Sequence, residues 1–155
     1  MKTRSAHRIS RPLCALALLV FAGVASAATL YEQIGGEAKL RAAVEEFMQI
    51  VLADDRINFT FGDTELKKFK ELLYEQICNL AHGPCRYTGR DMRTSHAKLN
   101  ISDAQFNALA EDLYEAFDRV HVPYRLQNRV IAMLAPMERD IVKPGLVPNT
   151  RLQPR

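Results

Sequence analysis

The sequence of 155 residues is poor in the residues that mark several protein classes. It has no Trp, three Cys, and only seven residues each of Gly and Pro. So few glycines and prolines exclude a collagen-like repeat and argue against a low-complexity chain. With 48% hydrophobic and 25% charged residues, the composition is that of an ordinary globular protein. Long apolar runs are also scarce, which excludes a membrane protein with several spans.

The one marked apolar run lies in an N-terminal segment that has the features of an export signal. Residues 1–27 carry four Lys and Arg within the first eleven positions, continue with an apolar stretch over 13–24, and end in Ala25-Ser26-Ala27. The stretch is shorter than the roughly 18 apolar residues of a membrane-spanning helix, and the small residues suit a signal peptidase. We therefore predict a cleaved signal peptide at 1–27, a domain at 28–142 and a flexible tail at 143–155. An uncleaved membrane anchor is the alternative.

The predicted export carries consequences for charge and location. The formal charge of the whole chain is +3, but residues 28–155 hold 17 Lys and Arg against 18 Asp and Glu. The basic excess therefore belongs to the segment that is removed, and no basic stripe with interleaved aromatics remains. We expect a periplasmic or secreted protein that binds no nucleic acid and makes no stable membrane insertion after cleavage.

Two cysteines, Cys78 and Cys85, remain after cleavage. An even pair in an oxidising compartment favours a disulfide, with two free thiols as the alternative. His82 lies between them, so a metal site is a third interpretation. That interpretation lacks a fourth ligand, and the spacing fits no common zinc pattern.

Apolar residues recur at helical spacing along the chain, and no segment alternates as a strand does. The sequence therefore predicts an all-α protein. Capping boxes begin helices at Thr29 and Ser102, and Gly35-Gly36 stops the first helix. The other expected helices are one over 37–53, one capped by Asp63 or Thr64 that carries Leu66 to Ile77, a short one over 92–99, and a last one from Pro123 to Ile141 that is kinked at Pro136.

Common catalytic signatures are missing. The sequence has no G-x-S-x-G, no H-E-x-x-H, no phosphate-binding glycine loop and no C-x-x-C-H for covalent haem attachment. Histidines after residue 27 are His82, His96 and His121. We expect His82 and His121 to be solvated, whereas His96 follows Met92 by one turn and precedes other apolar residues. His96 is thus either a core histidine bonded to a carbonyl group or a ligand.

An ordered set of short motifs resembles the group I truncated haemoglobins over residues 29–142. The set comprises Tyr31, Ile34-Gly35-Gly36, Phe47, Asp54-Asp55, Phe61, Gly83-Pro84, Tyr87-Thr88-Gly89, Met92, His96, Ile101, Phe106, Val122-Pro123 and Leu134-Ala135-Pro136. The resemblance implies a shortened globin, in which a two-over-two sandwich of helices encloses one non-covalent haem b.

The resemblance also implies roles for individual residues. His96 matches the proximal histidine that binds the haem iron, and Phe61 matches the phenylalanine that packs on the haem face. Further pocket residues are Phe47, Met48, Phe69, Leu73, Tyr87, Met92, Ile101, Phe106, Leu109 and Leu134.

The chain departs from the family pattern at the positions that face a bound gas. Met48 stands where many members have a tyrosine, and Phe69 and Leu73 occupy the other usual distal positions. Tyr74 and Gln76 are near in sequence, but a helix turns them by about 100° and 300° from Leu73. We therefore expect neither to enter the pocket without a local shift. Met48 as a sixth, thioether ligand is an alternative.

These features predict a haem protein that reversibly binds oxygen, nitric oxide or carbon monoxide in an apolar pocket and retains oxygen weakly. One alternative is an enzyme, either a nitric oxide dioxygenase or a peroxidase-like protein, that depends on an unidentified reductase. Others are a haem or electron carrier and a helical module without a cofactor.

Overall fold

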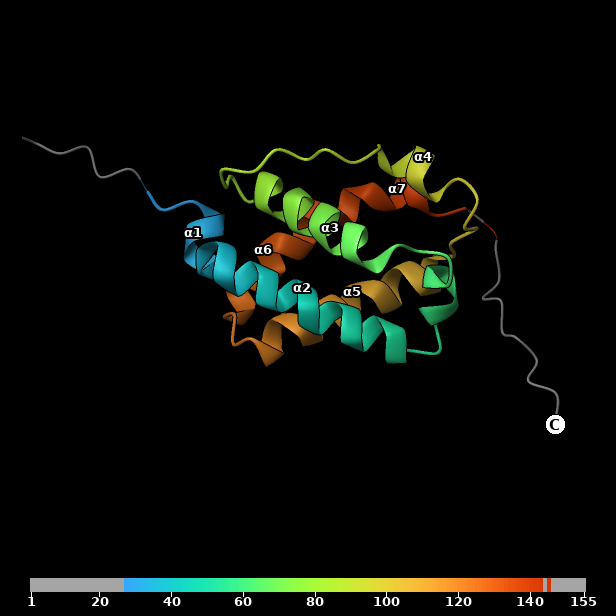
Figure 1. The fold of residues 1–155 in the computed structure, drawn as a ribbon, viewed down its shortest axis with the longest axis horizontal. Helices are drawn as coiled ribbons and strands as arrows, with labels where there is room; N and C mark the ends of the chain where they lie inside the picture. Colours follow the sequence, from blue (N-terminus) through green and yellow to red (C-terminus); the bar gives the residue numbers. More distant parts are fainter. Residues whose placement is uncertain (1–26, 144, 146–155) are drawn as a thin grey trace, which may run out of the picture.

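The computed structural model describes residues 27–143 and 145, and within them the chain is helical (Figure 1). Its elements are α1 (Leu30–Ile34), α2 (Gly36–Ala53), η1 (Asn58–Phe61), α3 (Leu66–Leu80), α4 (Met92–His96), α5 (Asp103–Arg119), α6 (Tyr124–Leu134), η2 (Ala135–Met137) and α7 (Glu138–Ile141), where η marks a short 3-10 helix. The predicted signal peptide, except Ala27, and most of the predicted tail lie outside the described residues.

The four long helices pack as two pairs. Helix α2 contacts α3 and α5, and α6 contacts the same two helices from the other layer. Helices α4 and α7 pack against each other beside α3 (Figure 1). This arrangement is the predicted two-over-two helical sandwich, and the all-α prediction is confirmed. None of the described helices is long and apolar enough to cross a membrane.

Local capping explains where the first helices begin and end. The Thr29 side chain accepts from the Glu32 amide, and the Glu32 carboxylate accepts from the Thr29 amide, which is the predicted capping box. Gly35 then takes φ +114°, a conformation that a side chain disfavours, and this lets α2 begin at once in a new direction. An equivalent box between Ser102 and Gln105 opens α5.

The predicted cap of α3 is wrong. Neither Asp63 nor Thr64 caps this helix, because the Thr64 amide donates to Phe61 O and so belongs to the turn that closes η1. The N-cap is Glu65, which makes no side-chain capping bond. Helix α4 is also shorter than predicted, because regular helix ends at His96 rather than at Leu99.

Pro136 interrupts the last predicted helix, as expected. It lies in η2, between α6 and α7, where its missing N–H cannot continue the α-helical bonding. After α7 the chain returns to the start of α5, where the Lys143 amide donates to Ile101 O at 3.0 Å. Ile101 and Val142 form an isolated parallel bridge there, and no regular strand occurs among the described residues.

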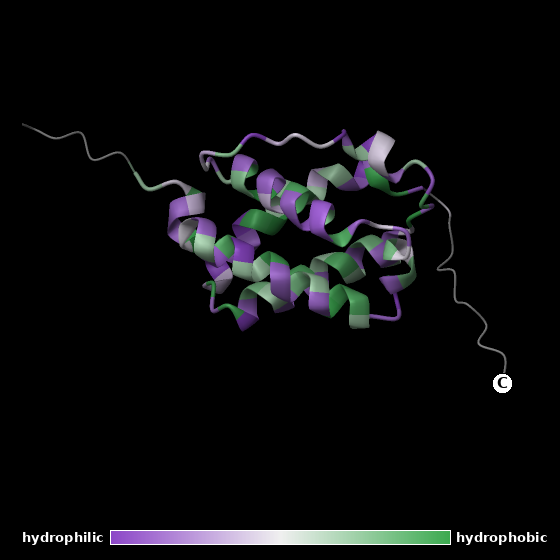
Figure 2. Ribbon diagram, viewed as in Figure 1, coloured by the Kyte–Doolittle hydropathy of each residue, from purple (hydrophilic) through white to green (hydrophobic). Residues whose placement is uncertain are grey.

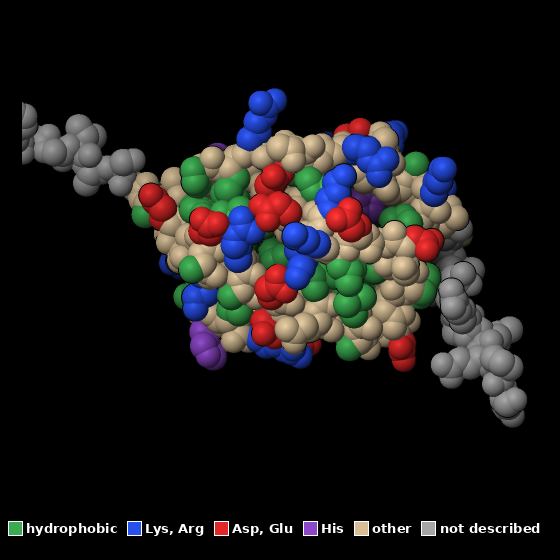
Figure 3. Space-filling view, in the orientation of Figure 1, with side chains coloured by type: hydrophobic (Ala, Val, Ile, Leu, Met, Phe, Trp, Pro, Cys, Tyr) green, Lys and Arg blue, Asp and Glu red, His purple; other side chains and the backbone are tan. Residues whose placement is uncertain are grey.

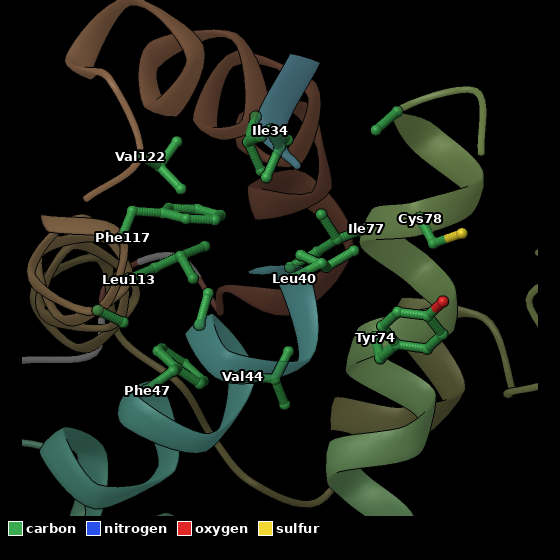
Figure 4. Packing of buried hydrophobic residues seen from close by; sticks show 14 of the residues in the cluster. Ile34, Leu40, Val44, Phe47, Tyr74, Ile77, Cys78, Leu113, Phe117 and Val122 are labelled. Carbon is green, nitrogen blue, oxygen red and sulfur yellow. The ribbon is translucent and has the colours of Figure 1, made fainter. Parts of the chain in front are cut away.

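A closed core lies between α1, α2, α5, α6 and one face of α3. Leu40, Ile77 and Phe117 are fully buried in it, and Figure 4 shows Phe47 beside Leu113 in the same cluster. Hydrophilic and hydrophobic turns alternate along α2 and α3, as expected of helices with one buried face (Figure 2).

Candidate functional site

A second group of large apolar side chains packs against the core without being enclosed. We call it the half-buried cluster, and its members are Phe61, Leu66, Phe69, Leu73, Leu109, Ile131, Met133 and Leu134. They come from η1, α3, α5 and α6. The rings of Phe61 and Phe69 meet edge to face with centroids 5.3 Å apart. Large apolar side chains that stay partly exposed on several elements are typical of a binding surface rather than of a completed core.

Helix α3 contributes to both apolar regions through two different faces. Tyr74, Ile77 and Cys78 are buried, whereas Phe69 and Leu73 are half-buried. The half-buried face turns toward α4 and η2, because Gln76 on this face places its Nε2 atom 3.5 Å from Met92 Sδ and 3.4 Å from Met137 Sδ. Helix α3 therefore separates the closed core from the region that contains His96.

The expectation that Gln76 enters the pocket only after a local shift stays a prediction, although its amide already reaches Met92 of α4 and Met137 of η2. Gln76 follows Phe69 by seven residues, which is a rotation of only about 20° around the helix. The angular position of Gln76 relative to Leu73 alone does not show that Gln76 and Phe69 share a face of the helix. The contact with Met137 was also missed, since it joins segments that are 61 residues apart.

Tyr74 does not enter the half-buried side. Its hydroxyl lies 3.2 Å from the Tyr31 hydroxyl of α1, and the Arg41 guanidinium lies 3.9 Å from the centre of its ring. Burial raises the pKa of Tyr74 to about 12, so its hydroxyl stays neutral in the ordinary pH range. Tyr74 is thus a structural residue of the core.

His96, at the end of α4, has one nitrogen fixed and one free. Its Nδ1 lies 2.8 Å from Met92 O in the preceding turn. With the proton on Nδ1, this nitrogen donates to the carbonyl group, and Nε2 keeps its lone pair. Nε2 has no hydrogen-bond partner among the described residues. The half-buried His96 therefore has an orientation that metal-binding imidazoles adopt, with one ring nitrogen bonded to a carbonyl group and the other left for a metal.

Helix α4 has only five residues, so the preceding loop has to hold it in place. A disulfide joins Cys78 of α3 to Cys85 of this loop, with the Cα atoms 5.7 Å apart. The Asn79 amide group donates to Cys85 O at 3.1 Å. Glu75 Oε2 accepts from the Thr88 amide at 2.9 Å and from its hydroxyl at 2.7 Å. These bonds fasten residues 85–88 to α3.

The end of the loop is shaped by Tyr87 and Gly89. The Tyr87 hydroxyl donates to Arg90 O at 2.8 Å, and partial burial raises its pKa. A Cβ atom on Gly89 would collide with the end of the Tyr87 side chain, so a larger residue at this position would displace the Tyr87 hydroxyl. Asp91 then caps α4 by accepting from the Thr94 amide at 2.8 Å.

The predicted site residues fall into two sets. Nine of them are half-buried, namely Phe61, Phe69, Leu73, Tyr87, Met92, His96, Phe106, Leu109 and Leu134. The other three are buried, with exposed fractions of 2% for Phe47, 4% for Met48 and 8% for Ile101. Phe47 packs in the closed core beside α5 (Figure 4).

Charged residues collect on a different face, over α2 and α3 (Figure 3). Arg41 pairs with Glu37 and Glu71 there, and Lys70 pairs with Glu45. A shallow surface groove lies there, lined by Arg41, Val44, Glu45, Lys67, Lys70, Glu71 and Tyr74. Because most of these charges neutralise one another, the groove has the character of a solvated surface.

A flat apolar cofactor with a central metal fits the residues around His96. Among the described residues, no group of three or more His, Cys, Asp and Glu could hold a metal ion by itself. The interpretation of Cys78, His82 and Cys85 as a metal site is therefore not supported. His96 offers a single free nitrogen next to apolar side chains, which suits a metal already held by a macrocycle such as haem.

Comparison with known proteins identifies the family. The sequence model of the bacterial-like globins matches residues 29–143. The group 1 truncated haemoglobin of Tetrahymena thermophila is 34% identical over 112 residues, covering 72% of this chain and 93% of the relative. That of Synechocystis sp. is 34% identical over 120 residues, covering 74% and 97%.

Solved structures agree. The 2/2 haemoglobin of Synechococcus sp., solved in the cyanomet state with covalently attached haem, superimposes with a TM-score of 0.70 at 32% identity, covering 74% of this chain and 98% of that one. The truncated haemoglobin of Tetrahymena pyriformis in its Fe(III) form gives a TM-score of 0.71 at 28% identity with the same coverage. The chain therefore belongs to the bacterial-like globins and, among them, to the group 1 truncated haemoglobins, whose cofactor is haem.

Proposed function

We propose that this protein holds one haem b without a covalent bond, with His96 Nε2 as the iron ligand, and reversibly binds a diatomic gas. The bond between His96 Nδ1 and Met92 O carries the proposal, since it leaves Nε2 free beside half-buried apolar side chains. When bound, haem supplies an iron coordination position that takes oxygen, nitric oxide or carbon monoxide. The residues of this chain decide how the haem is held and which gas is retained.

Apolar side chains on both sides of the site would exclude water from the haem. Phe61, Phe69 and Leu73 supply them from η1 and α3, while Met92 supplies one from α4. Burying such side chains stabilises by about 25 cal/mol for each Å² of apolar area removed from water. Haem binding is therefore expected to stabilise the protein as a whole.

The positions expected to face the gas carry no strong hydrogen-bond donor. Met48 has a thioether, and Phe69 and Leu73 are hydrocarbons. Bound oxygen carries partial negative charge, so its retention depends on a donor, whereas carbon monoxide and nitric oxide depend on it less. We infer that oxygen leaves this protein faster than it leaves relatives with a tyrosine at the position of Met48.

We also propose that the protein is exported to the periplasm or beyond. The pattern of residues 1–27 supports export. The Cys78–Cys85 disulfide is consistent with export, because such bonds persist in oxidising compartments. N-terminal sequencing of protein from the cell envelope is expected to begin at Ala28. Recovery from the cytosol with an intact N-terminus would count against export.

The spectrum of the purified protein tests haem binding. The wild type and His121→Ala, which alters an exposed histidine, are expected to show the same Soret band after haem is supplied. His96→Ala is expected to show a shifted or weaker band that added imidazole restores, because imidazole replaces the missing ligand. Identical spectra and haem-loss rates for wild type and His96→Ala would contradict ligation by His96.

A further inference from the structure

Gln76 brings an amide group into surroundings that are otherwise apolar. It is half-buried on α3, and its Nε2 contacts Met92 Sδ of α4 and Met137 Sδ of η2. No other hydrogen bond of its side chain occurs among the described residues. An amide group with two N–H donors therefore lies beside His96's helix.

The partners of this amide are poor ones. Thioether sulfur is a weak acceptor, so the two contacts of 3.5 and 3.4 Å, although ordinary in length for sulfur, hold the amide only weakly. A half-buried donor gains free energy when a stronger acceptor replaces a weak one. The Gln76 amide is thus free to exchange the sulfurs for a more polar partner that enters the site.

Gln76 also lies on the correct face of α3. It shares this face with Phe69, seven residues earlier, and both residues flank Leu73. Phe69 and Leu73 are the α3 residues expected beside the bound gas, and neither donates a hydrogen bond. The Gln76 amide is therefore an uncharged donor on the same face of α3 as Phe69 and Leu73.

We propose that Gln76 sets the preference of this protein among diatomic gases by donating a hydrogen bond from Nε2 to the bound gas. The inference rests on the proposed haem site. The contact between Gln76 and Met92 joins α3 to α4, so a haem held between these helices would break it and release the amide. Oxygen, with its partial negative charge, gains most from the donor, and carbon monoxide gains least.

Gln76→Leu in the haem-loaded protein replaces the donor by an apolar side chain of similar size. We expect oxygen to dissociate about two- to tenfold faster, the range that one hydrogen bond implies. The C–O stretching frequency of bound carbon monoxide is expected to rise, because it reports the loss of a nearby donor. Carbon monoxide dissociation is expected to change much less than oxygen dissociation.

Two further variants separate the donor from simple packing. Gln76→Glu has the same shape without the amide N–H groups, so it is expected to release oxygen faster, as the leucine variant does. Gln49→Leu makes the same chemical change at an exposed position of α2 and is expected to match the wild type.

Each outcome has a distinct meaning. A normal Soret band with unchanged oxygen dissociation and C–O frequency in both Gln76 variants overturns the role of Gln76 and leaves the proposed function standing. A wild-type protein that takes up no haem overturns both. Faster haem loss in Gln76→Leu with an unchanged C–O frequency assigns Gln76 to packing and contradicts the inference.

Discussion

The two apolar regions of this molecule differ in how completely the chain encloses them. In the closed core, Leu40, Ile77 and Phe117 have no measurable exposure. In the half-buried cluster, side chains that are just as large, such as Phe61 and Phe69, stay partly exposed. A chain of this size has enough apolar residues to complete one core by itself. The difference indicates that the second region is completed by another group.

The two regions also differ in their scaffolds. Helices α2 and α5, which hold the core, have 18 and 17 residues. Helix α4, which carries His96, has five and depends on a loop fastened to α3. A helix this short is unstable by itself. The core therefore determines whether the protein folds, whereas the loop and the contact of α4 with α7 determine where His96 lies.

The largest expected effect comes from truncating one ring in each region. Phe117→Ala opens a cavity in the core and is expected to lower the free energy of unfolding by about 3–5 kcal/mol, with or without haem. Phe69→Ala is expected to lower the free energy of unfolding much less than Phe117→Ala does when haem is absent, since the chain only half-buries its ring. With haem bound, the loss caused by Phe69→Ala is expected to be clearly larger. Denaturant unfolding of both forms measures this. If Phe69→Ala lowered the free energy of unfolding equally with and without haem, the proposed difference between the two apolar regions would be wrong.

Asp112 is one of four polar residues buried among the described residues, with Ser102, Gln105 and Gln127, and it is the one that carries a carboxyl group. It is 4% exposed, and one carboxylate oxygen has no partner. Burial, followed by the nearby Asp54 charge, raises its pKa to about 6, although Arg56 lies 3.7 Å away and acts in the opposite direction.

The pH dependence follows from the raised pKa. The folded state holds the proton up to about pH 6, whereas the unfolded state loses it near pH 4. The contribution of Asp112 to stability is therefore present below pH 4 and is lost as pH rises to 6, by up to about 3 kcal/mol. We expect Asp112→Asn to stabilise the protein at pH 7 and to flatten this part of the profile. Parallel profiles for the variant and the wild type would assign the pH dependence to other groups.

Breaking the disulfide tests the scaffold of the site. Cys78→Ser with Cys85→Ser is expected to lower the free energy of unfolding by about 2–3 kcal/mol, as closure of a short loop implies. It is also expected to speed haem loss, because residues 85–88 lose one of their fastenings to α3. A thiol reductant is expected to reproduce both effects in the wild type and to have none in the double variant. An unchanged rate of haem loss would show that the disulfide stabilises the fold and does not help to hold the haem.

The smallest expected effect concerns Met48. Met48→Tyr places a hydroxyl where related proteins carry one, and oxygen dissociation is expected to slow by about tenfold, the equivalent of one good hydrogen bond. Met48→Leu, which adds no donor, is expected to leave the rate near that of the wild type. Stopped-flow replacement of oxygen by carbon monoxide gives the rates. A tyrosine variant as fast as the leucine variant would show that residue 48 lies out of reach of the gas.

Features that depend on neighbouring residues could be predicted from the sequence. The capping boxes at Thr29 and Ser102 and the interruption at Pro136 involve groups within one turn, and each prediction is confirmed. The prediction of the α3 cap was wrong because Thr64 belongs to the preceding turn, in which its amide donates to Phe61 O. His96 could be singled out from its apolar neighbours, and its bond to a carbonyl group is confirmed, whereas its role as a ligand stays a prediction. Nδ1 bonds a carbonyl group, and Nε2 is free.

Features that depend on distant contacts could not be predicted. Nothing in the sequence distinguishes Phe117, which is fully buried, from Phe106, which is half-buried, because both lie on one stripe of α5. The contact of Gln76 with Met137 likewise requires the fold, since it joins α3 to a turn near the end of the chain. The roles of the twelve predicted pocket residues remain predictions that binding experiments have to test.

Hydrogen exchange of the protein with and without haem tests most directly the claim that haem completes the second region. Haem is expected to protect amides of α4, of the loop at 85–91 and of the half-buried end of α3, and to leave α2 and the middle of α5 nearly unchanged. His96→Ala is expected to lose the added protection in α4 first. Protection spread evenly over the molecule, or none at all, would contradict the account.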